Sequence, residues 1–217
     1  NGCSRLAAYT LSAPPPLTAS LQPGTYGAFN ISCAGADDGF INATINGGTV
    51  FHDIQWTGPD GFAAGTVNIF DLAPGTYTLN VTDANGCGVS ASRTLIAPTA
   101  VSADLSPSTS TSGDAIACNG GATGSVDLTV TGGAQPYTTT WEGPDGYGST
   151  EQDITGLMAG TYAVTITDAN GCTQVLPITL TEPSPIVVNA NATDHNGVGV
   201  SCSGHMDGGM EAVVSGG

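Results

Sequence analysis

Six cysteines are the residues of this chain whose type and spacing could do chemistry. One set follows a strand-like segment and the other set closes an Asn-Gly turn. The first set is Cys33, Cys118 and Cys202, and the second is Cys3, Cys87 and Cys172. Cysteines placed so regularly in small β-rich units form disulfides in an oxidising compartment. We therefore expect disulfides and an extracytoplasmic setting.

Two pairing schemes fit the six cysteines. In the favoured scheme, two cysteines 54 residues apart bond within each whole unit, which gives Cys33–Cys87 and Cys118–Cys172 and leaves Cys3 and Cys202 to pair outside this stretch. Closing a loop of that length stabilises a domain by about 4 kcal/mol in the chain-entropy model. The rival scheme joins neighbouring units, as Cys3–Cys33, Cys87–Cys118 and Cys172–Cys202. Zinc is disfavoured because there is no Cys-x-x-Cys pair and the three histidines do not recur.

Four aspartates are candidate ligands for a cation. Asp83 and Asp168 open the two Asp-Ala-Asn-Gly-Cys turns, where a carboxylate ordinarily accepts hydrogen bonds from turn N–H groups. The alternative is that these residues, together with Asp37, Asp38 or carbonyl groups of a neighbouring unit, hold Ca²⁺ and stiffen a junction. No Asp-x-Asp-x-Asp-Gly loop supports that alternative. The expected cofactor set is therefore none, with calcium as the possibility to test.

Two aromatic residues are candidates for contact with a ligand. Phe62 and Tyr147 follow the Pro-Asp-Gly turns of both whole units, where an exposed ring could stack on a sugar or on a neighbouring filament. The favoured interpretation is that each ring packs back on its own hairpin. Four further aromatic residues fall at inward strand positions and are expected in the core: Trp56, Trp141, Tyr77 and Tyr162.

Catalysis finds no support, and we expect no enzyme. No serine, cysteine or threonine lies in a nucleophile elbow, and no glycine-rich loop opens a helix to hold phosphate. A net charge of −16 with two arginines and no lysine excludes a surface that tracks nucleic acid and disfavours anionic membranes. No apolar run reaches the 18 or so residues of a transmembrane helix, so no membrane insertion is expected in this fragment.

The elements that carry these residues are repeated. Residues 75–87 return almost unchanged as residues 160–172, and Trp, Tyr, Cys and Pro positions recur at an interval of about 85 residues. That period is too long for a solenoid turn, and it predicts small domains arranged as beads on a string. We expect residues 1–16 to be the C-terminal tail of one repeat, 17–98 and 99–183 to be whole repeats, and 184–217 to begin another.

Each repeat is predicted to be an immunoglobulin-like β-sandwich. Tyr77, Leu79 and Val81 alternate with polar residues, which indicates a half-buried strand, and six or seven such segments are separated by Gly, Pro and Asn-Gly turns. A Trp in the third strand and a Tyr near the start of the penultimate one fit this fold. One difficulty stands, because the favoured bond joins two turns that lie at opposite ends of such a sandwich.

The order of these features resembles the SprB repeat family. It runs Cys, Asp-Gly, Gly-Gly, Tyr, Trp, then Leu-x-x-Gly-Thr-Tyr, Asp-Ala-Asn-Gly-Cys and a closing Pro. Residues 132–137 before Trp141 fit well, whereas Val50-Phe-His52 and the long segment 22–30 depart from the pattern. The resemblance implies an extracellular shaft of a very large adhesin on the surface of gliding Bacteroidetes. It also implies export by the type IX secretion route and display as a filament.

Three functions therefore enter the comparison with the structure. The first is a structural and adhesive stalk on the bacterial cell surface, whose expected partners are the neighbouring repeats of the same chain, with surface polysaccharide or other filament copies as further candidates. The second is an array that binds surface polysaccharide or protein through its loop tips. The third is an accessory module of a secreted enzyme. Tandem repetition favours the first two, because repeated domains give reach and avidity.

Overall fold

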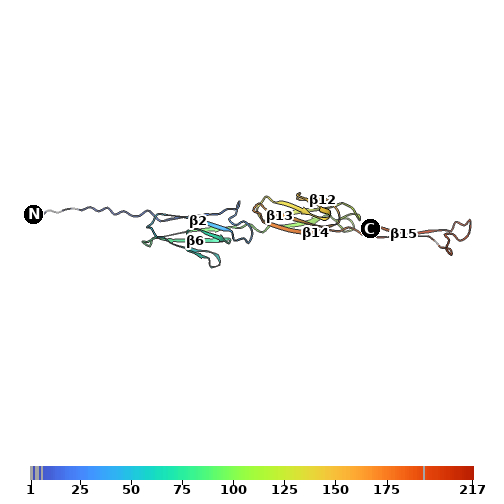
Figure 1. The fold of residues 1–217 in the computed structure, drawn as a ribbon, viewed down its shortest axis with the longest axis horizontal. Coiled ribbons are helices and arrows are strands. Elements are labelled where there is room, and N and C mark those ends of the chain that lie inside the picture. The colour runs from blue at the N-terminus through green and yellow to red at the C-terminus, as the bar shows by residue number, and fades with distance from the viewer. Residues whose placement is uncertain (1, 3–4, 6, 193) are drawn as a thin grey trace. The chain divides into compact units, whose positions relative to one another are not determined.

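The computed structural model describes residues 2, 5, 7–192 and 194–217, and its regular secondary structure consists almost entirely of β-strands (Figure 1). Its contacts divide the chain into two compact units. The first takes in the chain up to Val101 together with Gly132–Pro136 and Asp168–Cys172, and the second takes in the rest. The all-β expectation is thus confirmed. Among the described residues, no helix is long and apolar enough to cross a bilayer.

The first unit contains a sandwich of two antiparallel sheets. One sheet has the order β1-β2-β5 and the other the order β4-β3-β6-β7. Their strands are β1 (Thr18–Pro23), β2 (Gly39–Asn46), β3 (Asp53–Thr57), β4 (Ala63–Ala64), β5 (Ile69–Leu72), β6 (Gly75–Thr82) and β7 (Gly88–Leu95). Seven strands divided in this way have the topology of an immunoglobulin-like domain, which confirms the predicted fold class.

Alternation along the strands supplies the core of this sandwich. In β6, Tyr77, Leu79 and Val81 are buried, while Thr76, Asn80 and Thr82 between and beside them are exposed. Strands β2 and β5 place Ile41 and Ile69 in the same cluster of buried side chains. Because side chains of a strand point alternately to its two faces, one face of each sheet is apolar and the other is wetted.

Two aromatic side chains fix the corners of the fold. Trp56 of β3 is buried, and its indole N–H donates to the carbonyl oxygen of Thr66 at 2.9 Å. The Tyr77 hydroxyl donates to the carbonyl oxygen of Ala73, four residues upstream, at 3.0 Å. This second contact is the tyrosine corner of immunoglobulin-like domains, and it ties the start of β6 to the loop that precedes it.

The second unit repeats this plan. Its sheets have the orders β12-β9-β8 and β11-β10-β13-β14. Their strands are β8 (Ser102–Pro107), β9 (Gly124–Thr131), β10 (Thr138–Glu142), β11 (Gly148–Ser149), β12 (Ile154–Leu157), β13 (Gly160–Thr167) and β14 (Thr173–Leu180). Trp141 is buried, and the Tyr162 hydroxyl donates to the Met158 carbonyl oxygen at 3.0 Å. The internal repeat in the sequence is therefore a repeat of topology and of corner contacts.

A further hairpin follows these strands in the second unit. Strands β15 (Val187–Ala192) and β16 (Met210–Ser215) pair antiparallel, in the way that β8 pairs with β9. Every residue of both strands is exposed, whereas β9 buries Val126 and Leu128. The boundaries predicted at 98/99 and 183/184 fall between β7 and β8 and between β14 and β15, and they stay a prediction.

The tyrosine corner gives the first testable prediction. The change Tyr77→Phe removes the donor to Ala73 and leaves a partly buried carbonyl unpaired, so the free energy of unfolding should fall by about 1 kcal/mol. Urea unfolding followed by tryptophan fluorescence measures this. Tyr9→Phe is the matched control, because Tyr9 is 89% exposed and should leave stability unchanged. Equal stability of the two variants would contradict the role given to the corner.

Candidate functional site

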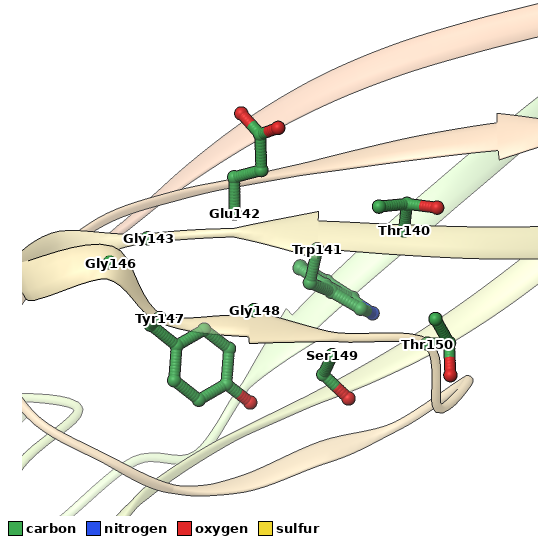
Figure 2. A pocket seen from close by; sticks show the side chains of 9 residues that line it. All are labelled: Thr140, Trp141, Glu142, Gly143, Gly146, Tyr147, Gly148, Ser149 and Thr150. Carbon is green, nitrogen blue, oxygen red and sulfur yellow. The ribbon is translucent and has the colours of Figure 1, made fainter.

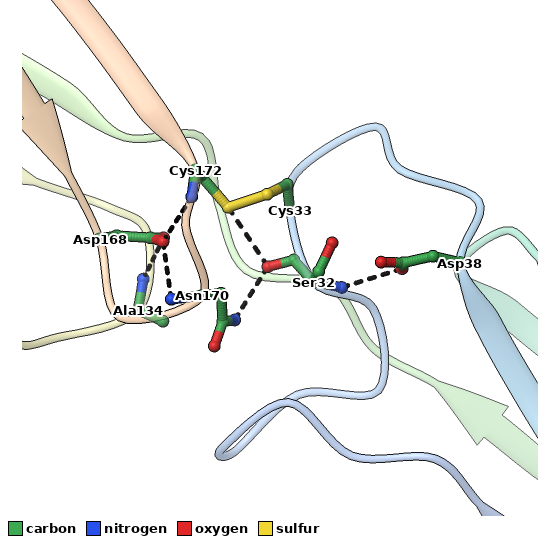
Figure 3. Close-up of a disulfide and its surroundings, with 7 residues drawn as sticks. All are labelled: Ser32, Cys33, Asp38, Ala134, Asp168, Asn170 and Cys172. Carbon is green, nitrogen blue, oxygen red and sulfur yellow. Dashed lines mark hydrogen bonds between the residues drawn. A yellow bond between two sulfur atoms is a disulfide. The ribbon is translucent and has the colours of Figure 1, made fainter.

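A disulfide between Cys33 and Cys172 is the site that the structure assembles (Figure 3). Cys33 lies in the connection between β1 and β2, and Cys172 ends the turn between β13 and β14. Their Cα atoms are 5.7 Å apart, although 139 residues separate them in sequence. The turn Asp168–Cys172 belongs to the first compact unit together with Cys33, so the bond lies inside that unit.

The segment before Cys33 is held against the end of β7. The main-chain N–H groups of Asn30 and Ile31 both donate to the carbonyl oxygen of Ile96, and the Asn30 side-chain oxygen accepts from the Ile96 N–H. The side-chain amide of Asn30 donates to the Gly24 carbonyl oxygen at 2.9 Å. Asn30 is buried and Ile31 is in the core. The position of Cys33 is thus set by the C-terminal end of β7, one strand length from Cys87.

The peptide groups around Ser32 lead directly into the disulfide. The Ser32 N–H donates to Oδ1 of Asp38 at 3.0 Å, and its carbonyl oxygen accepts from the side-chain amide of Asn170 at 2.8 Å (Figure 3). Burial opposes ionisation of Asp38, but the hydrogen bonds from Ser32 outweigh it and lower the pKa of that carboxyl. The residue before Cys33 is therefore held from both sides.

The turn that carries Cys172 is organised by one carboxylate. Oδ1 of Asp168 accepts the N–H groups of Asn170 and Cys172, each at 2.9 Å, and Oδ2 accepts the N–H of Ala134 at 2.9 Å. Ala134 in turn accepts at its carbonyl oxygen from the N–H of Ala169. Asp168 is buried, so these donors replace the water that its charge would otherwise bind. The result is a rigid turn that presents Cys172 and Asn170 together.

The favoured pairing scheme is wrong. Cys33 bonds to Cys172 and not to Cys87, so neither Cys33–Cys87 nor Cys118–Cys172 is formed. The segment before Cys33 pairs at Ile96, whereas Cys87 precedes the start of β7, and about 30 Å of extended strand lies between these points. A disulfide requires Cα atoms within about 7 Å. The difficulty with opposite ends of the sandwich disappears, because the bond that caused it does not exist.

The rival scheme is also wrong, although it did join cysteines of different repeats. It required Cys3–Cys33 and Cys172–Cys202, but Cys33 and Cys172 bond to each other. Cys87, Cys118 and Cys202 are free and exposed. Cys3 lies outside the described residues. The observed bond links the first cysteine position of one repeat to the second cysteine position of the repeat after it.

The aspartates have the turn role that the sequence favoured. Oδ1 of Asp83 accepts from the N–H groups of Asn85 and Cys87, and Oδ2 accepts from the N–H of Thr49. These backbone hydrogen bonds, with those of Thr49 and Cys87 the strongest, lower the pKa of Asp83. Within the described part of the chain, no three Asp, Glu, His or Cys side chains gather as a metal site would need. Calcium at Asp37, Asp38, Asp83 or Asp168 therefore stays a prediction.

The candidate ligand-contact residues pack against the corner tyrosines of β6 and β13, and not on the hairpins that carry them as expected. Phe62 meets Tyr77 edge to face at 5.2 Å between ring centroids, and Tyr147 meets Tyr162 in the same way at 5.3 Å. Both rings are half-buried. Figure 2 shows the open hollow of the β10–β11 hairpin. The side chains of Glu142 and Trp141 extend to opposite sides of β10. Its lining is Thr140–Gly143 and Gly146–Thr150.

Sequence reasoning missed the partners of the disulfide. The cysteine spacing gives no signal for Ser32, Ala134 or Asn170, which surround the bond. The signal that could have found the pairing was the difficulty with the sandwich ends: two turns at opposite ends of one sandwich cannot meet. Cys33 lies at the end of the sandwich where β7 ends and the chain continues into the next repeat. It can therefore reach a cysteine of that next repeat.

Two antiparallel sheets, a buried Trp and a tyrosine corner, all present twice, define the class of protein as tandem immunoglobulin-like domains. Residues 27–61 and 115–146 match the family described as SprB repeat. Two regions of the chain therefore match the SprB repeat family that the sequence pattern resembles. Both matches include the first cysteine of a repeat and the Pro-Asp-Gly turn. These matches and the immunoglobulin-like fold suggest extracellular adhesin-type repeat domains and point to a non-catalytic structural fold.

Two solved structures of immunoglobulin domains are similar to this chain at low identity. The amphioxus IgVJ-C2 molecule has 16% identity and a TM-score of 0.31, with 75% of this chain and 96% of that chain covered. The N-terminal eight Ig domains of Down Syndrome Cell Adhesion Molecule isoform 1.30.30 have 13% identity and a TM-score of 0.36, with 74% of this chain covered. The chain spans 24% of that second structure. No curated protein matches the sequence.

The carboxylate of Asp83 predicts a pH dependence. Its pKa is lower in the folded than in the unfolded chain, so its contribution is complete above about pH 4 and is lost as the pH falls through the lowered value. Asp83→Asn should lower the free energy of unfolding at pH 7. It should also make the fall of that free energy below pH 4 less steep, as measured by urea unfolding. Asp71→Asn, a change at an exposed residue of the same repeat, is the control. An unchanged acid profile in Asp83→Asn would refute the assignment.

The disulfide predicts a selective effect of removing its cysteines. A bond across 139 residues contributes up to about 5 kcal/mol in the chain-entropy model. Cys33→Ser should therefore lower the midpoint of thermal unfolding to that of the reduced protein. Cys118→Ser, at the equivalent position of the next repeat, should have no effect, because that thiol is free. The pairing is refuted if Cys33→Ser and Cys118→Ser lower the midpoint equally, or if neither variant lowers it.

Proposed function

We propose that the chain is part of the shaft of a cell-surface adhesin, where its repeats supply length and hold an adhesive region away from the cell. The observation that carries the proposal is the bond between Cys33 and Cys172. It connects a cysteine held at the end of β7 with a turn of the following repeat. A bond at that place adds nothing to a binding surface but resists separation of consecutive repeats, which is what a shaft requires.

The chemistry of the chain suits the outside of a cell. A structural disulfide persists where thiols are oxidised. The net charge of −16 keeps a long polymer soluble and self-repelling. With no lysine and only Arg5 and Arg93 as cations, the chain offers few sites to trypsin-like proteases, and Arg93 lies within β7. These properties support extracellular display, and the family resemblance adds export by the type IX route and a part in gliding.

The loop-tip array is the less supported function. A sugar-binding aromatic needs an exposed ring face, but Phe62 and Tyr147 are half-buried against the tyrosines of their own corners. The hollow at the β10–β11 hairpin is open to solvent, and its lining includes three glycines. The partners that we propose are therefore neighbouring repeats of the same kind, with contact to surface polysaccharide or other filament copies left to another region of the adhesin.

Antibodies raised against the chain test this function. They should label intact cells of the producing organism as strongly as permeabilised cells, and external proteinase should remove the label. Fab fragments of the same antibodies should leave attachment to a solid surface unchanged, because the proposed adhesive contact lies in another region of the adhesin. Labelling that appears only after permeabilisation would contradict surface display. Loss of attachment under saturating Fab would contradict the proposed division between shaft repeats and an adhesive region elsewhere.

A further inference from the structure

Cys118 lies in the same local frame as Cys33, 85 residues further on, but its thiol is free and exposed. The N–H of buried Ile116 donates to the Thr181 carbonyl oxygen at 3.0 Å, as Ile31 donates to Ile96 in the first repeat. The Ala117 N–H donates to the Thr123 hydroxyl at 3.0 Å. This hydrogen bond is equivalent to the one from the Ser32 N–H to Asp38 in the first repeat. The backbone that leads into Cys118 is therefore built as it is at the bonded site.

The loop after Cys118 is also fixed. The Glu182 carboxylate accepts from the side-chain amide of Asn119 at 2.9 Å and from the N–H of Gly120 at 2.7 Å. Asn119 donates in addition to the carbonyl oxygen of Pro183. The thiol is thus carried on a rigid loop and not on a loose one, which is the geometry expected of a half-site prepared for a partner.

A hollow lies beside this thiol, within the second unit. It is lined by Ala117–Asn119, Pro183–Ile186 and Gly217. Ile186 is 68% exposed there, whereas the equivalent Val101 is only 9% exposed. In the first unit Gly133 covers Val101 so closely that an added Cβ would lie 2.6 Å from Val101 Cγ2 and 2.8 Å from Asp168 Oδ2. The equivalent surface in the first unit is thus covered by the Asp-Ala-Asn-Gly-Cys turn and its support.

We propose that Cys118 and this hollow form a receptor for the Asp-Ala-Asn-Gly-Cys turn of a further repeat of the same kind, whose cysteine bonds to Cys118. In the reaction, both thiols lose a proton and an electron to a small disulfide oxidant, which becomes two thiols, and one S–S bond forms. The pattern would then run along the chain, with each repeat bonded to the next. This proposal rests on the proposed shaft function for its biological role. The two are tested separately, because disulfide mapping tests the bond and surface labelling tests the shaft function.

The chain already carries an unbonded copy of the inserted turn. Asp83 holds the turn before Cys87 with the same hydrogen bonds that Asp168 makes, and the Cys87 thiol is exposed. The partner of the asparagine side chain differs between the two turns. The Asn170 amide donates to the Ser32 carbonyl oxygen, whereas the Asn85 amide donates to the Thr49 hydroxyl at 2.7 Å. The turn at Cys87 is therefore formed without a bonded cysteine. We expect the side chain of its asparagine to exchange one hydrogen-bond acceptor for another when such a turn binds a receptor.

Disulfide mapping of a lengthened chain tests the proposal. Gly217 corresponds to Gly133, so appending a copy of residues 134–183 completes the third repeat and supplies the turn. After equilibration with reduced and oxidised glutathione, alkylation and non-reducing peptide mapping should find Cys118 bonded to the appended turn cysteine. Cys33–Cys172 should persist, and Cys87 and Cys202 should be alkylated. Alkylated Cys118, or Cys118 bonded to Cys87 or Cys202, would overturn the proposal.

A second arm uses the 217-residue chain as it stands and does not require the appended repeat to fold. The probe is a peptide of residues 80–90 with its cysteine activated as a mixed disulfide. It should modify Cys118 at least tenfold faster than Cys202, which lies after an exposed strand. Ile186→Glu should abolish that preference, whereas Val188→Glu on the same hairpin should keep it. Equal rates at Cys118 and Cys202 in the unchanged chain would refute a receptor at Cys118.

Discussion

The length of β7 is the constraint on which the rest of the structure depends. Cys87 precedes this strand and the Cys33 segment is held at its far end, so the two cysteines of one repeat are kept apart by a strand that neither can bend. Cys33 bonds beyond its own sandwich, to Cys172, whereas the Cys87 thiol is free. A small domain that would ordinarily use a disulfide to stabilise its own core instead uses it to hold its neighbour.

The hydrogen bonds around the cysteines explain how so long a loop can be closed with precision. Asp168 fixes one turn, Asp38 and Asn30 fix the other segment, and Asn170 joins them through the Ser32 carbonyl group. The sulfur atoms are thus brought together by polar contacts to the backbone before the covalent bond contributes. A covalent bond between cysteines of two consecutive repeats opposes their separation under a pull, which is the property that the proposed shaft needs.

Much of this could be predicted from the sequence. Alternation in β6 and the Asn-Gly and Pro-Asp-Gly turns are local signals, so the strands, the buried Trp56 and Tyr77 and the turn role of Asp83 followed from them. The disulfide could not be predicted in the same way, because spacing along a chain does not say at which end of a sandwich a residue lies. Asn30 fixes the end of the sandwich at which Cys33 lies. It does so through hydrogen bonds to Gly24 and Ile96, which are 6 and 66 residues away in sequence.

Single-molecule stretching of the chain by its two ends tests the central claim most directly. If Cys33 and Cys172 are bonded, the 139-residue loop between them is shielded from force, and a contour length on the order of 480 Å stays hidden until reductant is added. After reduction, both sandwiches should unfold in separate steps and release that length. Full extension of both repeats without reductant would show that the bond does not join them and would contradict the account.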